Sequence, residues 1–336
     1  MDIKNYIVLG NGFSINLVDE LKKSQEINLK NLFANGDKVK WPDNDEMGFL
    51  SRKHCEHLWT LGARSCMSNE DSFHFINNII TCLNVYNLAK SSNDTYTSPS
   101  DNIYLAAYNE LSTYLKNLFI YYNSLISDDE LLSVIDKIDL IKYIKDEIDK
   151  DNEVIVITYN YDIFLERLLK VKGIPYIISG FNNDTRKKVR IIKPHGSISF
   201  SSKINTISKT YEIKDTFDSI VANIKELKIK NTLIKDMSLV NAIIPPAGDS
   251  NRVSFGWPST LRKILMEKIK KSTEKDSLII YGISYDHVDR KELDDIITNI
   301  DSLINVKYIN PYPSDTFDLV LSSVFKNYIQ LKEFRI

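Results

Sequence analysis

Four polar segments of this chain carry residue types that can do chemistry, and each follows a short apolar run. They are Gly10-Asn11-Gly12-Phe13-Ser14, Thr158-Tyr159-Asn160-Tyr161-Asp162, Lys193-Pro194-His195-Gly196-Ser197 and Gly282-Ile283-Ser284-Tyr285-Asp286. Amide, carboxylate, imidazole and hydroxyl groups can orient water, transfer protons and bind phosphate or sugar oxygens. Open α/β sheets bind ligands at the carboxyl ends of their strands, so we expect one extended ligand to contact all four segments.

The first segment has the composition of a phosphate-binding turn. Gly10 and Gly12 lie between a predicted strand and a predicted helix, so backbone N–H groups and the positive end of the helix can face an anion. Ile15 stands where the dinucleotide fingerprint G-x-G-x-x-G has its third glycine, so that fingerprint is only half met. An ordinary turn is the alternative for these two glycines.

The elements that must position these segments alternate between strand and helix after residue 150. Apolar, β-branched runs predict buried strands, and helical periodicity between them predicts helices. Strands are expected at 3–9, 154–157, 176–178, 189–192, 240–244, 278–281 and 306–309, and helices at 15–21, 163–170, 258–271 and 288–300. The chain is therefore predicted to be an α/β protein with a Rossmann-like, mainly parallel sheet and helices on both faces.

A long stretch after the first strand and helix has almost no strand signals. Residues 35–70 are rich in turn residues. Helical patterns follow at 70–90, 102–126 and 128–148. The last pattern begins with a capping box formed by Ser127 and Glu130. We therefore predict a mostly helical insertion at 25–149 within a Rossmann-type catalytic domain made of 1–24 and 150–336.

Composition is that of an ordinary globular protein, with 43% hydrophobic and 26% charged residues. The net charge of -2 argues against a general nucleic-acid or acidic-membrane binder. Cys55, Cys66 and Cys82 form no C-x-x-C pair, and residues 54–57 with Cys66 fit no closed zinc pattern. The chain has no signal-like start and no apolar stretch of about 20 residues, so we expect a cytoplasmic protein.

Taken together and in this order, the four segments resemble the sirtuin-like NAD hydrolases, the catalytic modules of several bacterial antiphage systems. Sirtuins carry G-A-G-x-S after the first strand, a T-x-N-x-D element and a catalytic His followed by Gly. The matching stretches here are 10–14, 158–162 and His195-Gly196. The resemblance covers residues 1–16 and about 150–310, and the separation of Asn160 from His195 is also similar to that in bacterial members.

The resemblance implies hydrolysis of NAD+ to nicotinamide and ADP-ribose, with Asn160 and His195 as the catalytic residues. The NAD-binding residues that it implies are Gly10, Asn11, Gly12, Phe13, Ser14, Thr158, Asp162, Gly282 and Ser284. An uncharged amide suits the oxocarbenium-like ribosyl centre, because it orients water or ribose hydroxyls without trapping the cation. An imidazole suits a general base near neutral pH. Asp162 would accept hydrogen bonds from the nicotinamide carboxamide, as in the family.

The chain departs from the protein-deacylating sirtuins in two ways. It lacks their two C-x-x-C pairs and their Gly-Ile-Pro-Asp-Phe-Arg stretch, so we expect no structural zinc and disfavour deacylation. Each site residue also has a structural alternative. Asn160 and Asp162 could cap the following helix, Ser284 and Asp286 could cap the helix near 288, and His195 could be an ordinary turn histidine.

Other functions remain as alternatives to hydrolysis. A module that binds or senses NAD or an ADP-ribose derivative without cleaving it is the main one, followed by a lysine-directed transferase or deacylase and by an unrelated α/β enzyme such as a methyltransferase. A potent NAD hydrolase must be held inactive until infection, so we expect control by homo-oligomerisation or by a separately encoded defence partner, through the 25–149 insertion. The basic cluster at 185–190 is interpreted as a solvated hairpin, and we expect no direct nucleic-acid binding.

Overall fold

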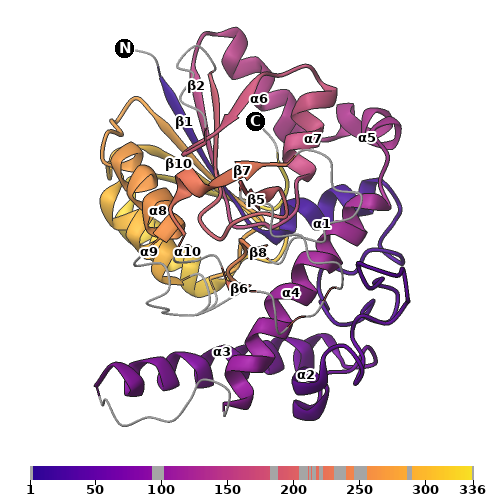
Figure 1. The fold of residues 1–336 in the computed structure, drawn as a ribbon. Helices are drawn as coiled ribbons and strands as arrows, with labels where there is room; N and C mark the ends of the chain where they lie inside the picture. Colours follow the sequence, from indigo (N-terminus) through magenta and orange to yellow (C-terminus); the bar gives the residue numbers. More distant parts are fainter. Residues whose placement is uncertain are drawn as a thin grey trace.

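A seven-stranded parallel sheet forms the centre of the computed structural model (Figure 1). The structure describes residues 3–92, 102–181, 188–203, 211, 213, 217–218, 222–230, 240–245, 256–285 and 290–334. The strands of the sheet are β1 (Lys4–Leu9), β2 (Glu153–Thr158), β3 (Tyr176–Ile178), β4 (Val189–Ile192), β9 (Ser277–Tyr281), β10 (Asn305–Ile309) and β11 (Asn327–Leu331). Their order is β11-β10-β9-β1-β2-β4-β3, and every neighbouring pair is parallel.

The register brings the four polar segments to one edge of this sheet. Leu9 lies opposite both Thr158 and Tyr281, and Ile157 lies opposite Ile192. The strands that precede the segments therefore end at nearly the same level, as parallel pairing predicts. The prediction of a Rossmann-like α/β fold with the polar segments along the carboxyl edge is confirmed.

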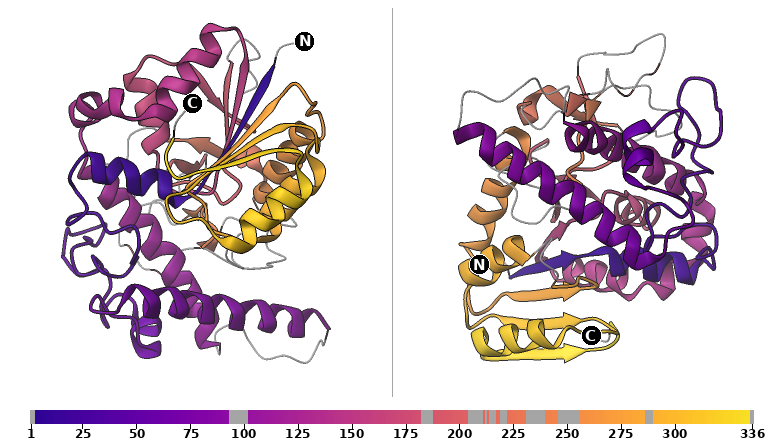
Figure 2. Two further views of the ribbon diagram at one scale, coloured as in Figure 1. Left: turned by 180° about the vertical axis from the view of Figure 1, so that it is seen from behind. Right: turned by 90° about the horizontal axis from the view of Figure 1, so that it is seen from below.

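Helices cover both faces of the sheet (Figures 1 and 2). The helices α8 (Gly256–Ile269), α9 (Arg290–Asn299) and α10 (Asp315–Val324) cover one face, and α1 (Asn11–Glu20), α6 (Asp139–Asp149) and α7 (Phe164–Val171) cover the other. Alternate residues of β1 point to opposite faces of the sheet and belong to two hydrophobic cores. Tyr6 and Val8 pack with α8, α9 and α10 on one face, whereas Ile7 and Leu9 pack with α1 on the other. A strand covered on both faces is apolar throughout, which is why the central strands were predictable.

A helical region lies beyond the carboxyl edge of the sheet (Figure 1). It contains α2 (Glu56–Leu61), α3 (Asn69–Ser92) and α4 (Ile103–Ser124), whereas α5 (Asp128–Val134) lies beside α7 and the 3-10 helix η2 (Ile135–Lys137) lies beside α6. Buried residues of α4, such as Leu111 and Leu115, belong to the same hydrophobic core as Leu9. Within the described residues no helix has the length and apolar composition needed to cross a membrane.

The predicted helix at 128–148 is wrong as a single element, although its capping box is confirmed. Ser127 accepts from the Glu130 backbone, and the Glu130 carboxylate accepts from the Ser127 backbone. Ile138 then leaves the helical region of backbone conformation, with φ -93° and ψ 88°. This break lets α6 change direction and bury Leu140 and Ile144.

The predicted strand at 240–244 does not join the main sheet. Only β8 (Val240–Asn241) is a strand, and it pairs with β6 (Phe217–Asp218) in a separate small sheet. The following residues, 242–244, instead bind the turn after β4. A second small sheet pairs β5 (Phe200–Ser202) with β7 (Leu227–Ile229), which follows the 3-10 helix η5 (Ile224–Glu226).

Some predicted features lie partly outside the described residues. The helix expected at 288–300 is described from Arg290, because 286–289 are outside the described residues. In the basic cluster at 185–190, only the last three residues are described. There Lys188 pairs with Asp151, and Arg190 with Glu153.

Candidate active site

The glycine turn after β1 packs backbone to backbone against Gly282 after β9. A Cβ atom on Gly10 would lie 2.6 Å from the Gly282 oxygen, and one on Gly12 would lie 2.6 Å from the Gly282 Cα. Gly282 has φ +62°, a conformation that glycine adopts readily. No larger residue fits this contact, so the three predicted glycines are explained by close approach of two strand ends.

Part of the phosphate-binding potential of this turn is already used inside the protein. The Gly12 N–H donates to the Gly282 oxygen at 2.8 Å, and the Phe13 N–H donates to the Gly10 oxygen at 3.2 Å. Asn11 turns its side-chain amide to the Leu29 oxygen, at 2.8 Å. The N–H groups of Gly12 and Phe13 and the side-chain amide of Asn11 are therefore not free to bind a pyrophosphate in this conformation. Other groups at the carboxyl edge of the sheet would have to bind it.

The side chain of Asn160, in the second polar segment, is hydrogen-bonded to the first segment. Its Nδ2 donates to the Gly10 oxygen and to Ser14 Oγ, each at 3.0 Å. Ser14 is fully buried in α1, and its hydroxyl donates in turn to Asp162 Oδ2 at 2.7 Å. Thr158 supports the segment by accepting from the Asn160 N–H at 3.2 Å. Asn160, Ser14 and Asp162 thus form one hydrogen-bonded chain at the end of β1 and β2.

Asp162 has a structural role that matches the capping alternative. Its Oδ1 accepts from the Phe164 N–H at 3.0 Å, at the first turn of α7, while Oδ2 is held by Ser14. The side chain is buried, and burial raises the pKa of its carboxyl group above the ordinary value, although the nearby Lys193 charge opposes this. Both oxygens are engaged, so a nicotinamide carboxamide would have to compete with these partners. Asn160, in contrast, bonds to α1 and not to the start of α7.

A buried ion pair next to this chain was not predicted. Lys193, at the end of β4, is completely buried and lies with its Nζ 2.8 Å from Glu166 Oε1 of α7. The same Nζ donates to the backbone oxygen of Asp162 at 2.5 Å. Lys193 thereby fixes the backbone of the second segment to the third. Glu166 lies on a helix whose sequence pattern does not reveal that this position is buried.

The turn that carries His195 is held by residues 242–244. Gly196 has φ +83°, and a Cβ atom there would lie 2.0 Å from the Ala242 oxygen. The Ser197 N–H donates to that oxygen at 3.2 Å, and the Ile244 N–H donates to the His195 oxygen at 3.0 Å. The His-Gly pair is therefore a fixed turn, in which only glycine fits after the histidine.

The His195 ring is buried between β2 and α9. Its centroid is 4.8 Å from that of the Tyr159 ring, and its Nε2 is 3.7 Å from Glu292 Oε1. Burial alone would raise the pKa of Glu292, but its hydrogen bonding and charge interaction with His195 outweigh burial and the pKa is lowered. A carboxylate in this position can orient the imidazole and stabilise its protonated form. Sequence reasoning missed Glu292, because no local pattern links α9 to the turn after β4.

The two predicted catalytic side chains lie at the same edge but contact different layers. Asn160 contacts α1, whereas His195 lies beside Tyr159, which belongs to the core under α8 and α9. The cavity next to His195 is about 10 Å³ and is lined by residues that include Tyr159, Arg262 and Glu292. Such a volume holds at most one water molecule. A ribose can reach the imidazole only after side chains around this cavity, such as Tyr159 and those of α8 and α9, move.

The remaining predicted residues are only partly described. Ser284 is exposed just beyond Gly282, whereas Asp286, with the predicted capping of the next helix, lies outside the described residues. In the metal-capable stretch, Cys55 is buried and donates to the Phe49 oxygen at 3.3 Å, and His57 Nδ1 lies 2.7 Å from Glu110 Oε1. In the part of the chain that the structure describes, no group of three or more His, Cys, Asp or Glu side chains is placed to hold a metal ion.

The fold is that of an α/β protein whose polar strand ends meet at one edge of a parallel sheet. Residues 154–305 match the family model of the SIR2-like domain. The match runs from β2 to the start of β10 and so contains Asn160, Asp162, His195 and Gly282. It supports the resemblance to the sirtuin-like family over this part of the chain and suggests an NAD-related function. A search of curated proteins gave no match.

Proposed function

We propose that this protein is an NAD+ glycohydrolase that breaks the nicotinamide–ribose bond and gives nicotinamide and ADP-ribose. The observation that carries the proposal is the fixed amide of Asn160, inside the SIR2-like domain and at the carboxyl edge of the sheet. Both Nδ2 hydrogens have acceptors, in Gly10 and Ser14. The amide oxygen is then the group that accepts from a water or a ribose hydroxyl, next to a centre that becomes positive.

The reaction needs few groups. The bond between ribose C1′ and the pyridine nitrogen breaks, and its electron pair leaves with nicotinamide, which departs as a neutral molecule. Water then adds to the oxocarbenium-like carbon and loses a proton. We assign that proton to His195 Nε2, with the Glu292 carboxylate stabilising the imidazolium that forms. The antiphage role belongs to this proposal, since loss of NAD would stop growth of an infected cell.

The small cavity beside His195 fits an enzyme that is held inactive. With about 10 Å³ next to the imidazole, a ribose has no access to the general base. We propose that homo-oligomerisation or a defence partner opens this layer. Opening would need only the side of Tyr159, α8 and α9 to move, because Asn160 is already fixed on the other side.

The test measures NAD+ loss and the two products by chromatography, with the purified full-length protein and in cells expressing it with and without phage. We expect NAD+ loss with the wild-type chain under at least one of these conditions, and none with Asn160→Ala or His195→Ala. Activity that survives in both variants would contradict the mechanism. Intact NAD+ under every condition would contradict the proposed function.

A second candidate is a module that binds NAD or an ADP-ribose derivative without cleaving it. Two observations favour it: both oxygens of the Asp162 carboxylate are already hydrogen-bonded, and the imidazole of His195 is closed off from a ribose, so it could not act as a base on a ligand bound elsewhere along the edge. Calorimetry that shows NAD+ binding, followed by recovery of all NAD+ intact after long incubation, would support this candidate over hydrolysis.

A further inference from the structure

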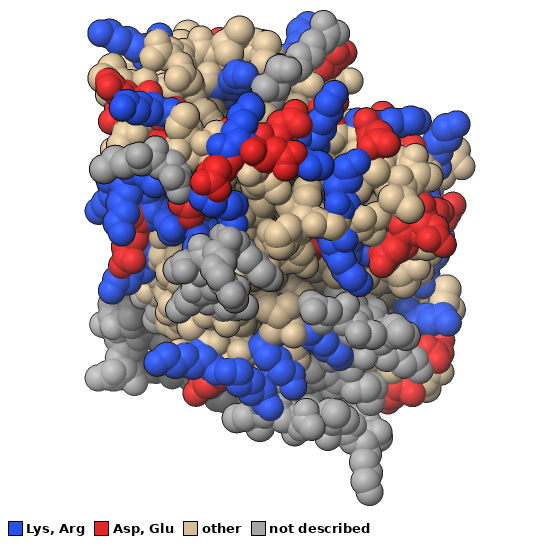
Figure 3. Space-filling view, turned by 90° about the horizontal axis from the view of Figure 1, so that it is seen from above, with Lys and Arg blue, Asp and Glu red and all other residues tan. Residues whose placement is uncertain are grey.

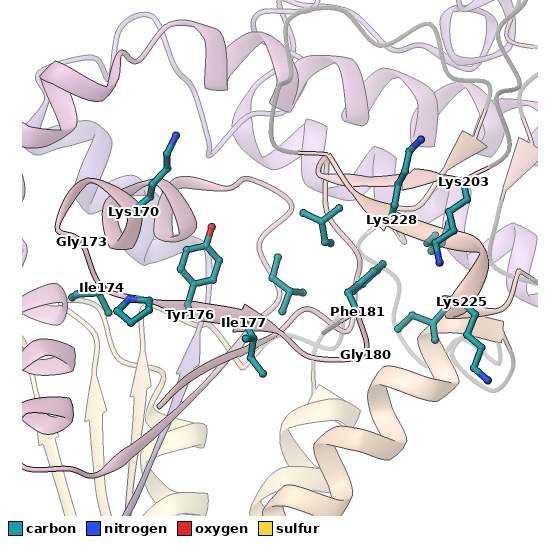
Figure 4. A pocket seen from close by; sticks show the side chains of 15 residues that line it. Lys170, Gly173, Ile174, Tyr176, Ile177, Gly180, Phe181, Lys203, Lys225 and Lys228 are labelled. Carbon is teal, nitrogen blue, oxygen red and sulfur yellow. The ribbon is translucent and has the colours of Figure 1, made fainter. Parts of the chain in front are cut away.

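A groove of about 720 Å³ borders the outer edge of the sheet at β3 (Figure 4). Its described lining residues come from the end of α7, from β3 and the turns on either side of it, and from the segment containing η5 and β7. It shares no lining residue with the cavity beside His195. The groove is therefore separate from the site for which we propose NAD chemistry.

Two strand edges form the sides of this groove. Residues 176–178 of β3 and 227–229 of β7 all line it. Successive residues of a strand point to opposite faces, so a groove lined by three in a row meets the edge of the strand and its backbone. Among the described strands, β3 pairs only with β4, and β7 pairs only with β5. Each strand therefore turns an edge without a strand partner toward the groove.

The charge of the groove is positive. Its described lining includes Lys170, Lys203, Lys225 and Lys228 and contains no Asp or Glu. Lys170 lies 4.0 Å from Asp128, and for the other three lysines the described residues provide no ion pair. In Figure 3, positive and negative side chains are intermixed over the upper part of the view, whereas positive side chains predominate in a band across its lower part. Between the lysines the lining is apolar and includes Ile174, Phe181 and Ile229.

We propose that this groove binds an extended acidic peptide segment of a partner protein as an added strand. The backbone of such a segment can bond to the edges of β3 and β7, as in other cases of strand addition. Its alternate side chains would meet the lysines and the apolar floor, because they point to opposite faces of the strand. A nucleic acid would satisfy the lysines but would leave the strand edges and the apolar floor unused. The inference does not depend on the NAD chemistry.

The test measures fluorescence anisotropy of a labelled peptide, acetyl-(Glu-Val)4-amide, with the full-length protein at low salt. We expect saturable binding of this peptide and none of acetyl-(Lys-Val)4-amide. Combined Lys203→Glu, Lys225→Glu and Lys228→Glu substitutions should weaken binding about tenfold or more, since three attractive charges become repulsive. The matched control reverses three exposed lysines outside the groove, Lys270, Lys275 and Lys326, and should leave binding unchanged.

A second arm separates strand addition from simple charge attraction. A (Glu-Val)4 peptide methylated at alternate backbone nitrogens keeps its charge but loses donors to a strand edge, so its binding should be lost. The proposal is overturned if the unmodified peptide does not bind, or if the groove and control variants bind it equally. It is also overturned if the methylated peptide binds as well as the unmodified one, or if the oligonucleotide (dT)12 binds this groove more tightly than the peptide.

Discussion

Replacing Asn160 by alanine should abolish NAD+ hydrolysis at a small and measurable cost in stability. The substitution removes two hydrogen bonds of 3.0 Å, to the Gly10 oxygen and to Ser14 Oγ. A typical hydrogen bond contributes about 0.5–1.5 kcal/mol net, so we expect the free energy of unfolding to fall by about 1–3 kcal/mol. Loss of one preorganised polar group at a developing charge typically lowers kcat on the order of 10²–10³-fold. The fold should survive while turnover does not.

The chain offers a matched control for this substitution in Asn35. Its Nδ2 also donates to one backbone oxygen, that of Glu26, and to one hydroxyl, that of Tyr122, each at 3.0 Å. Asn35→Ala should therefore lose a similar free energy of unfolding and keep full activity. Urea unfolding followed by circular dichroism gives the stabilities, and chromatography of nicotinamide gives the rates. Equal activity in the two variants, whether both retain it or both lose it, would refute the role assigned to Asn160.

Three further predictions concern the groups around this amide. His195→Ala should lower kcat on the order of 10²–10⁴-fold with little change in KM, because the general base is lost. Glu292→Gln should lower kcat only about five- to tenfold, because it removes the partner of a charge pair worth about 1 kcal/mol. Steady-state kinetics at neutral pH distinguishes the two variants. Burial raises the pKa of Asp162, so the stability linked to its protonation is present at low pH and is lost as pH rises through the raised pKa. The difference in free energy of unfolding between wild type and Asp162→Asn should therefore be larger at acidic pH than at neutral pH, as measured by urea unfolding. Lys193→Met leaves the buried Glu166 without its cation and should lower the free energy of unfolding by about 3–5 kcal/mol, and adding Glu166→Leu should restore most of that loss in a double-mutant cycle.

The central sheet could be predicted because its strands are buried on both faces. Residues 154–157 and 189–192 are continuous apolar or nearly apolar runs, and the structure has strands there. The last strand, β11, was missed because it lies at the sheet edge and its residues are exposed or half-buried. Helix α10 was missed as well, since only Phe317 and Leu321 of its residues are buried and they give little periodicity.

The position of the four polar segments could be predicted from the sequence, because it depends on where the parallel strands end. Parallel pairing of β1, β2, β4 and β9 brings the four polar segments to one edge whatever the loops do. The partners of His195 and Lys193 were not predictable. Glu292 and Glu166 reach them from α9 and α7, and their positions depend on how those helices pack, which no local spacing records.

The segment 158–162 connects the two halves of the candidate site. Tyr159 contacts the His195 ring, while Asn160, the next residue, is fixed to the glycine turn and to α1. Tyr161 donates its hydroxyl to the Ile244 oxygen at 2.6 Å, and its own backbone oxygen accepts from the Ile198 N–H at 3.0 Å, so it also binds the turn that carries the histidine. Of these three successive residues, Tyr159 contacts the proposed base, Asn160 carries the amide to which we assign catalysis, and Tyr161 supports the turn of the histidine. A rotation of the Tyr159 side chain to another rotamer moves its ring away from His195 without displacing the Asn160 amide, whose partners lie on the other side of the segment. A shift of the Tyr159 backbone, in contrast, would also move Asn160, so access to His195 and the position of this amide are coupled only if the backbone of the segment moves.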